Sequence, residues 1–427
     1  MLMTPQVHQA DALKGVVALP GDPGWDQVRS GFNLLVDQRP DAVAFPLDER
    51  DVATAVNFAR RNGLRVAPQA TGHNQAALGD LAGTLLVNVG ALQEVHIDPA
   101  ARRVRVGAGV KWERVAPRLS AYGLAGLHGS SPDVGIAGYS LGGGIGWLAR
   151  EHGMQANAVT ALELVTAEGN LVRADAERHA DLFWALRGGG GNFGVVTAIE
   201  FAVHPVDRLY AGAMFFPFER ASEVLHTWSG LLPELPDELM SWASLAHFPA
   251  VPDVPEFARG RSFAVVMGAF LGSEAEGRSL LRPLRDLGPA RDTFASVPPV
   301  VLGDLAMDPL DPLPFHLGHQ LLDGLPPGAV DAVLAAVGPG SGRGDTLTML
   351  QFRHMGGALA REAPGAGARD APRRGLHGDA GPRARRGRRP PRAPGGRIGP
   401  ASTPTSSRSR PTPARSSPPR RGRVCAP

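Results

Sequence analysis

Residues 128–146 read HGSSPDVGIAGYSLGGGIG, and this run carries more structural information than any other part of the chain. Six glycines lie within the twelve residues from Gly135 to Gly146, with small or apolar side chains and almost no charge between them. Glycine lets a backbone approach a ligand closely, and consecutive N–H groups can form a nest for an anion. We therefore expect a glycine loop packed against a flat partner rather than a surface loop.

The same run contains a formal Gly-x-Ser-x-Gly motif centred on Ser140. In α/β-hydrolases this motif follows a buried strand, which presents the serine on a sharp turn. Here Pro132 and Gly135 interrupt the residues before the motif, and no His-Gly-Gly-Gly loop lies upstream. A serine hydrolase using Ser140 therefore stays only as a less favoured alternative.

A second glycine motif, Gly189-Gly-Gly-Asn-Phe-Gly194, matches the formal Gly-x-Gly-x-x-Gly fingerprint of dinucleotide sites. That fingerprint requires a strand before it and a helix after it, so that the pyrophosphate meets a helix N-terminus. Here a predicted helix (179–187) precedes the glycines and a predicted strand (195–203) follows them. The inverted order argues against a nicotinamide site.

Short strands alternate with helices from about residue 33 to residue 205, which is an α+β pattern. Runs of β-branched residues bounded by turn residues predict the strands, and an apolar face after the capping residue Asp48 predicts the best-defined helix. The expected strands are 41–46, 64–68, 84–89, 104–106, 159–166, 171–174 and 195–203, and the expected helices are 48–62, 112–121 and 179–187. Residues 1–30 are predicted to form a helical lead-in.

The pattern changes after Asp207, where longer segments begin. We expect strands at 211–218, 263–271 and 347–354, and helices at 221–232, 274–287 and 329–337. This order indicates a second α+β domain, with an antiparallel sheet covered by helices. The predicted division is a lead-in (1–32), a first domain (33–206), a second, incomplete domain (207–361) and a tail (362–427).

A third informative segment is Val66-Ala-Pro-Gln-Ala-Thr-Gly-His73-Asn-Gln, which overlaps the end of a predicted strand. It holds glycine, threonine and amide side chains but no charge, so its backbone could donate hydrogen bonds to a phosphate. A lone histidine in such a turn is usually a local hydrogen-bonding group. On the residues alone, a chemical role for His73 is the minority interpretation.

Together these segments resemble the FAD-linked oxidases with a vanillyl-alcohol-oxidase-type (PCMH-type) FAD-binding domain, in the berberine-bridge-enzyme-like branch. The resemblance covers residues 33–205, and it is looser over 207–361, where it implies the family's substrate domain. It rests on spaced motifs in the same order: Pro40-Asp-Ala-Val-Ala-Phe-Pro46, Thr71-Gly-His73, the glycine run, Gly153-Met-Gln-Ala-Asn157 and Leu182-Phe-Trp-Ala-Leu-Arg-Gly-Gly-Gly-Gly-Asn-Phe-Gly-Val195. It implies an FAD-dependent oxidase that removes hydride from a CH–OH or similar carbon of a small-molecule substrate, with O2 as the reoxidant.

The resemblance also implies roles for single residues. His73 matches the histidine that bonds covalently to the flavin 8α-methyl group. Ser131 falls where many relatives carry a cysteine that makes a second link, and a serine cannot form that thioether, so attachment through His73 alone is expected. Val134 falls at a gate to O2, where a small residue goes with oxygen-reactive members of the family. Tyr139 falls beside the flavin pyrimidine edge and is the one catalytic candidate, while the base is unassigned.

The FAD contacts implied by the resemblance come from four separate parts of the sequence. They are Gln69, Ala70, Thr71, Gly72, His73, Asn74, Ser131, Val134, Gly135, Gly138, Tyr139, Gly142, Gly143, Asn157 and Val195. Asn157 stands where the family more often has an aspartate. No metal site is expected.

Composition narrows the class of protein further. The only cysteine is Cys425, which excludes a disulfide framework, a cysteine zinc site and a catalytic thiol in the core. Neither Lys14 nor Lys111, the only lysines, follows a glycine, so the chain has no Walker A loop. No run of 18 apolar residues and no apolar signal-peptide segment occur, so we expect a cytoplasmic protein without membrane contact.

The tail has a composition of its own. Residues 369–427 hold 16 arginines, two acidic residues and no Phe, Tyr or Trp, which leaves 28 basic and 39 acidic residues in positions 1–368. We expect disorder here because the segment cannot bury enough apolar surface to offset its chain entropy. No nucleic-acid partner is expected, because the tail has no interleaved aromatic residues.

The abrupt start of this tail suggests that the C-terminal part of the family's domain is lost or frameshifted. In the family, a tyrosine-containing motif returns to the flavin, but no tyrosine follows Tyr210 here. An inactive flavin-binding remnant is therefore the main alternative to an active oxidase. The sequence leaves the oligomeric state open.

Overall fold

The computed structural model describes residues 13–341 and 348–368 of the chain. The expectations for residues 1–12 and for the tail beyond residue 368 lie outside these ranges. All described residues fall in one unit by their mutual contacts. The expected domain boundary between residues 206 and 207 therefore stays a prediction.

A four-stranded sheet forms the first layer, in the order β1-β2-β4-β3. Strands β2, β4 and β3 run parallel, and β1 pairs antiparallel with β2. The four strands are β1 (Val16–Ala18), β2 (Ala42–Phe45), β4 (Thr84–Asn88) and β3 (Arg65–Gln69). Helix α2 (Glu49–Arg61) buries Val52 and Val56 in the same core, and the Asp48 side chain caps it by accepting from the Asp51 N–H at 2.8 Å.

The start of the described chain differs from the expected helical lead-in. It holds the strand β1 and only a four-residue helix, α1 (Trp25–Val28). Gly21 and Gly24 both have positive φ values, 99° and 79°, which interrupt any longer helix. The Asp51 carboxylate accepts hydrogen bonds from the N–H groups of Lys14 and Gly15, which ties this segment to α2.

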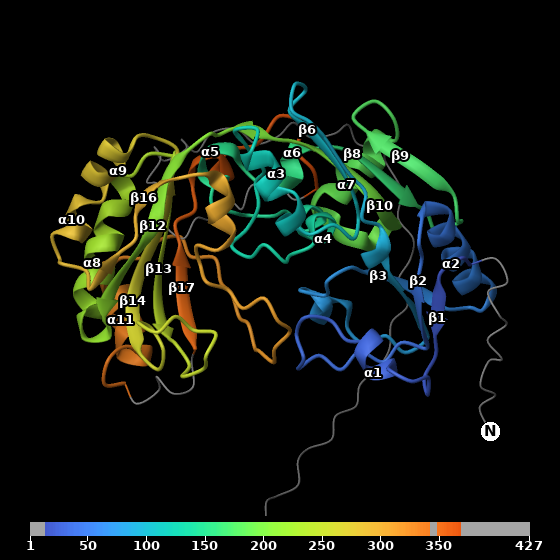
Figure 1. Cartoon of the computed structure of the whole chain (residues 1–427), viewed down its shortest axis with the longest axis horizontal. Helices are drawn as coiled ribbons and strands as arrows, with labels where there is room; N and C mark the ends of the chain where they lie inside the picture. Colours follow the sequence, from blue (N-terminus) through green and yellow to red (C-terminus); the bar gives the residue numbers. More distant parts are fainter. Residues whose placement is uncertain (1–12, 342–347, 369–427) are drawn as a thin grey trace, which may run out of the picture. The chain divides into compact units, whose positions relative to one another are not determined.

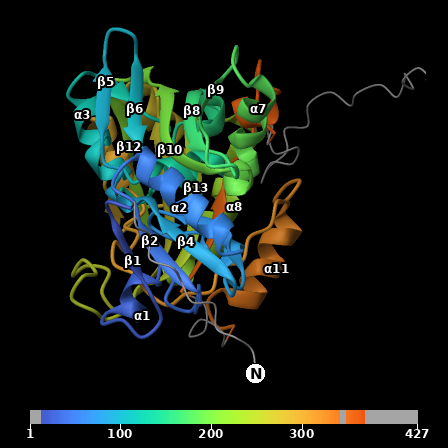
Figure 2. The ribbon, with the colours of Figure 1, turned by 90° about the vertical axis from the view of Figure 1, so that its right-hand side faces the viewer.

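A five-stranded antiparallel sheet forms the second layer, and its strands stand side by side in Figure 2. In spatial order they are β5 (Val95–Asp98), β6 (Arg103–Gly107), β10 (Val195–Ala202), β8 (Val159–Val165) and β9 (Leu171–Asp175). Helix α7 (Ala180–Gly189) precedes the Gly189–Gly194 motif and β10 follows it. The inverted order that argued against a nicotinamide site is thus present in the structure.

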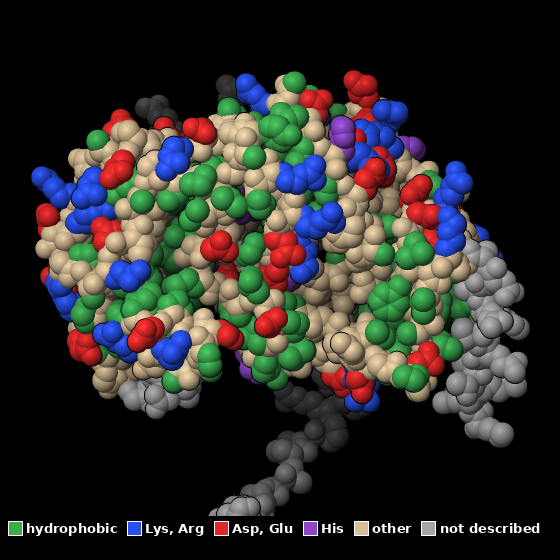
Figure 3. All heavy atoms as spheres, in the orientation of Figure 1, with side chains coloured by type: hydrophobic (Ala, Val, Ile, Leu, Met, Phe, Trp, Pro, Cys, Tyr) green, Lys and Arg blue, Asp and Glu red, His purple; other side chains and the backbone are tan. Residues whose placement is uncertain are grey.

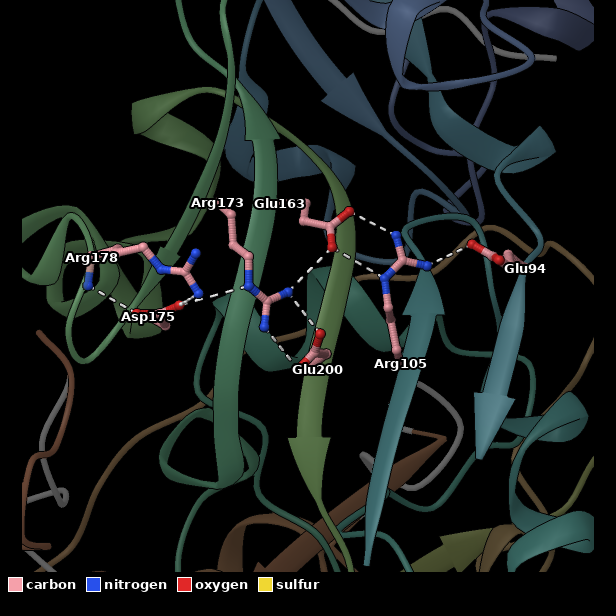
Figure 4. Close-up of polar contacts among 7 residues, drawn as sticks. All are labelled: Glu94, Arg105, Glu163, Arg173, Asp175, Arg178 and Glu200. Carbon is pink, nitrogen blue, oxygen red and sulfur yellow. Dashed lines mark hydrogen bonds and ion pairs between the residues drawn. The ribbon is translucent and has the colours of Figure 1, made fainter. Parts of the chain in front are cut away.

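One face of this second sheet carries a network of ion pairs (Figure 4). Because side chains alternate along a strand, Val104 and Val106 of β6 enter the core while Arg105 points to the other face. Arg105 holds Glu163 through two contacts, Nε to Oε1 at 3.1 Å and Nη2 to Oε2 at 2.6 Å. Arg173 joins Glu163 at 3.3 Å to Glu200 at 2.7 Å. Four adjacent strands are therefore linked across their outer face.

Replacing the central acid, Glu163→Gln, is expected to lower the free energy of unfolding by about 1 kcal/mol, the upper range for partly exposed pairs. The hydrogen bond from Arg105 lowers the pKa of Glu163, so its contribution is present at neutral pH and is lost as pH falls through that lowered pKa. Urea unfolding at neutral and acidic pH measures both effects. Glu94→Gln, at the exposed end of the network, serves as control and should change stability far less.

A larger antiparallel sheet forms the second half of the described chain, in the order β15-β12-β14-β13-β17, with β16 also paired to β12. Its strands are β12 (Leu209–Pro217), β13 (Leu239–His247), β14 (Ser262–Phe270), β15 (Arg291–Asp292), β16 (Ala295–Val297) and β17 (Met349–Arg353). Helices cover one face of it (Figure 1): α8 (Ala221–Leu231), α9 (Glu274–Leu280), α10 (Arg282–Arg285) and α11 (Pro327–Val337). The expected antiparallel sheet covered by helices is confirmed, but β13 was not predicted, and the expected helix 274–287 is divided at Leu281.

The other face of this large sheet packs against residues of the first half. The Trp147 and Trp242 rings stack at 3.7 Å between centroids, and both are fully buried. Strand β11 (His204–Pro205) pairs with β7 (Leu124–Ala125) nearby. The short helices on this side are α3 (Ala116–Ser120), α5 (Ala149–His152) and α6 (Gln155–Ala158). The two halves therefore share a hydrophobic core.

Two further features concern the surface of the protein and the last described residues, 362–368. Acidic and basic side chains are interspersed over the face drawn in Figure 3. No helix within the described ranges is long and apolar enough to cross a membrane. Residues 362–368 were assigned to the tail, but the structure places them against α7, where the Ala368 N–H donates to the Trp184 carbonyl at 2.9 Å and Arg187 donates to the Gly365 carbonyl at 2.7 Å.

Candidate functional site

The segment that follows β3 forms a tight turn around His73. Gly72 has a φ of 76°, and a Cβ on it would lie 2.7 Å from the Gly31 Cα, so only glycine fits this position. The turn then continues into a 3₁₀ segment, Gln75–Leu78. The backbone that carries the His73 side chain is therefore fixed.

Three groups surround the His73 ring. The ring of Phe32 stacks on it at 4.0 Å between centroids. Its Nδ1 lies 2.9 Å from the Thr71 hydroxyl oxygen, and its Nε2 lies 3.3 Å from the Asp133 Oδ2. The second contact is within ion-pair distance but is not aligned as a hydrogen bond, so Nε2 is a buried polar atom without a hydrogen-bond partner.

Electrostatics favours a neutral His73 ring. Burial lowers the pKa of His73, and the positive charge of Lys111 lowers it further, while Asp133 opposes both effects. The net shift is downward, so the ring is uncharged at neutral pH. A neutral imidazole has one nitrogen lone pair free to act as a nucleophile.

The glycine run lies directly beside this turn. A Cβ on Gly135 would sit 3.6 Å from both Ala70 and the Thr71 hydroxyl, so the two segments are in contact. The expected glycine loop is wrong in one respect, because Ile136–Leu141 forms helix α4. The cause is tertiary packing: the small residues allow a tight helical turn, and Ile136 and Leu141 are buried in the main core. Beyond α4, a Cβ on Gly146 would lie 1.9 Å from the His128 carbonyl oxygen, so the run is packed as expected.

Several buried polar atoms near this turn lack partners, and they test whether FAD fits. They belong to Gln69, His73, Gln155 and Asn157. Gln155 and Ala156 are tied to the glycine run, because their N–H groups donate to the carbonyls of Gly144 and Gly143 at 2.9 and 2.8 Å. Buried polar groups without partners are costly, and a polar ligand would satisfy them. These buried atoms, which include amide oxygens that accept and an amide nitrogen that donates, therefore fit a flavin nucleotide.

Three other residues expected to contact FAD, Gly138, Gly142 and Val195, lie in different surroundings. Gly138 faces open space, since a Cβ there would meet no atom within 4 Å, whereas Gly142 lies against the Gly138 carbonyl. Val195 lines a pocket of about 350 Å³ together with Pro68, which directly precedes Gln69. The roles toward FAD of all the residues expected to contact it, His73, Tyr139, Val134, Gly143, Asn74 and Val195 among them, stay predictions.

Tyr139 and Ser140 lie next to each other in α4. The Tyr139 hydroxyl donates to the Leu127 carbonyl at 2.9 Å, and burial raises the pKa of this phenol. It is thus arranged as a hydrogen-bond donor rather than as a base. Ser140 is 1% exposed and its hydroxyl donates to the Ile136 carbonyl at 2.8 Å within the same helix. This placement does not present Ser140 as a nucleophile.

Three charged residues near the site were not found from the sequence. Asp133 contacts His73, and Asp308 accepts a hydrogen bond from the Ser130 hydroxyl at 2.6 Å. Arg353, on β17, lies over the Trp242 ring at 3.9 Å, and its charge influences Tyr139. The Ser-Ser-Pro-Asp sequence was a possible signal for Asp133, but Asp308 and Arg353 approach only through the tertiary fold. Within the described ranges, no cluster of residues suits a metal ion.

Comparison with known proteins shows what the chain is similar to. A family profile described as FAD binding domain matches residues 40–175. The chain is 32% identical over 277 residues to (R)-6-hydroxynicotine oxidase of Paenarthrobacter nicotinovorans, a match that covers 65% of this chain and 59% of that protein. The chain therefore has an FAD-binding domain and is similar to the FAD-linked oxidoreductases whose FAD-binding domain is of the PCMH type. The cofactor of this FAD-linked oxidoreductase is FAD.

Solved structures agree with this assignment. Xylooligosaccharide oxidase from Myceliophthora thermophila C1, solved with xylobiose, superposes with a TM-score of 0.68 at 25% identity, covering 86% of this chain and 80% of that one. Glucooligosaccharide oxidase from Acremonium strictum, which carries 6-S-cysteinyl, 8α-N1-histidyl FAD, superposes with a TM-score of 0.57 at 24% identity, covering 67% and 59%. At this sequence identity, the second superposition shows that the two proteins share a fold and carries no conclusion about function. Matches to three curated relatives span 59%, 63% and 66% of their lengths, so the activity of a whole relative is only a proposal for this FAD-linked oxidoreductase.

Proposed function

We propose that this FAD-linked oxidoreductase is an oxidase that carries FAD covalently on His73 alone. It removes hydride from a CH–OH or similar carbon of a small molecule and passes the electrons to O2. The supporting observation is the His73 turn, a fixed and neutral imidazole among buried polar atoms that lack partners. The names of its relatives, a hydroxynicotine oxidase and a xylooligosaccharide oxidase, agree with an oxidase of small organic molecules.

The residues of this chain have separate tasks in the proposal. The backbone of Gln69–Asn74 would hold the pyrophosphate, and Gln155 and Asn157 would bond to the cofactor through their unsatisfied polar atoms. When bound, FAD supplies the hydride acceptor. Ser131 bonds to Asp133 and cannot form a thioether, which leaves one covalent link.

The proposal is tested on the purified full chain. We expect the flavin absorbance bands, flavin that stays with the protein after acid precipitation, and O2 consumption with at least one of 6-hydroxynicotine, xylobiose and simple alcohols. Flavin found only in the acid supernatant contradicts attachment through His73. Covalent flavin without any O2 consumption favours the inactive remnant instead. A protein without flavin contradicts both.

A further inference from the structure

Asp133 is a buried carboxylate whose two oxygens face different partners. It is 4% exposed. Its Oδ1 accepts a hydrogen bond from the Ser131 hydroxyl at 2.5 Å, and its Oδ2 faces the His73 Nε2 at 3.3 Å. Within residues 13–341 and 348–368, no arginine or lysine lies within ion-pair distance of it. A buried carboxylate needs donors: the Ser131 hydroxyl donates to Oδ1, and the His73 Nε2 faces Oδ2 at ion-pair distance without being aligned as a hydrogen bond.

The position of this carboxylate is fixed by the backbone on both sides of it. The N–H groups of Trp112 and Glu113 donate to the carbonyls of Val134 and Pro132, at 3.1 and 2.7 Å. The Ile136 N–H donates to the Val110 carbonyl at 2.9 Å. Residues on either side of Asp133 are thus held to the neighbouring segment, so the carboxylate is pre-positioned against the imidazole.

We propose that Asp133 is the positioning residue that prepares His73 for covalent attachment to FAD. The carboxylate accepts the Nε2 proton and so selects the tautomer whose lone pair lies on Nδ1. The Thr71 hydroxyl then donates to Nδ1 until the covalent bond forms. The carboxylate also stabilises the positive charge that develops on the ring during bond formation. This inference rests on the proposed link through His73.

The covalent step balances as follows. The His73 Nδ1 lone pair forms a bond to the 8α carbon, and a C–H bond of that methyl group breaks, with its proton passing to water. This proton and the Nε2 proton are the two that end in hydrogen peroxide when O2 takes the two electrons. The Nε2 proton leaves toward Asp133, and the two electrons released reduce the flavin. O2 is the oxidant that restores the oxidised flavin, with one hydrogen peroxide formed for each chain. No other co-reactant is needed.

Asp133→Asn tests the proposal because it keeps the shape of the side chain but cannot accept a proton as a carboxylate does. The full-length variant is incubated with FAD in air, and samples are precipitated with acid at intervals. We expect FAD to bind non-covalently, with an attachment rate at least about 10-fold below wild type, the loss typical when the group that orients a histidine is removed. Asp133→Glu, which restores a carboxylate, should recover part of that rate.

Asp308→Asn is the matched control, since Asp308 influences His73 only through its charge and bonds to Ser130. It should attach FAD at the wild-type rate. Attachment at the wild-type rate in Asp133→Asn overturns the proposal, as does equal slowing in Asp133→Asn and Asp308→Asn. If Asp133→Asn does not fold, Asp133→Glu is compared with Asp133→Ala instead. The proposal is overturned if the folded Asp133→Glu variant attaches FAD no faster than Asp133→Ala. Absence of covalent FAD in the wild type overturns the His73 link itself, and this inference with it.

Discussion

His73→Ala is expected to leave no flavin on the protein after acid precipitation, whereas the wild type keeps its flavin in the precipitate. The effect is expected to be all-or-none because no cysteine stands where a second link would form. Its only cysteine, Cys425, lies outside the glycine run, and Ser131 cannot form a thioether. Intact-mass measurement should give the mass of the His73→Ala chain alone, whereas the wild-type chain should carry the added mass of one FAD.

A matched control separates this chemistry from a general loss of binding. His96→Ala removes an exposed histidine from β5, remote in sequence from the turn, and should keep its covalent flavin. His73→Ala should still bind FAD reversibly through the remaining polar groups, so flavin should leave it during dialysis. Acid-stable flavin in His73→Ala would mean that another residue forms the bond, and it would falsify the assignment of His73.

Local signals predicted most of the secondary structure. Asp48 caps α2 as expected, and the strands expected at 159–166 and 171–174 are present as β8 and β9, which pair as a hairpin. In each case the deciding interaction lies within a few residues, so the sequence contains it directly. The inverted order of helix and strand around Gly189–Gly194 was predicted for the same reason.

The elements that were missed depend on tertiary contacts. Strand β13 contains Ser241 and Ser244, which weaken its apolar signal. The fold satisfies Ser241 from afar, since its hydroxyl accepts from the Trp228 indole N–H at 2.9 Å and donates to the Met267 carbonyl at 3.2 Å. Helix α4 was hidden by its glycines, because its stability comes from buried Ile136 and Leu141 rather than from helix propensity.

The same distinction between local signals and tertiary contacts holds for the candidate site. The His73 turn and the glycine run were predicted because each is contiguous and carries a family motif. Asp133 contacts a histidine 60 residues away, and Arg353 reaches the site from the last described strand. No local pattern connects such pairs, so only the folded structure brings them together.

Arg150→Met is expected to have the largest effect on stability. Arg150 lies in α5 with its side chain 5% exposed. Its guanidinium donates to the carbonyl of Met355, which follows β17, and to the carbonyls of Leu235 and Pro236 before β13, the last two at 3.2 Å. It also lies 3.3 Å from the Asp237 carboxylate and thus joins the first half of the chain to the start of β13 and the end of β17, which are adjacent strands at one edge of the large sheet.

Methionine keeps much of the volume of Arg150 but removes the donor to these carbonyls and leaves Asp237 with Arg361 as its remaining cation. Removing one partner of a buried charged network costs about 3–5 kcal/mol, a large part of a total stability of about 5–15 kcal/mol. Urea unfolding followed by circular dichroism measures the loss. Arg361→Met is the control, because Arg361 bonds to the other Asp237 oxygen at 2.8 Å from a side chain that is 61% exposed, and its loss should cost less than about 1 kcal/mol. Equal stability losses in the two variants would show that Arg150 does not join the halves in this way.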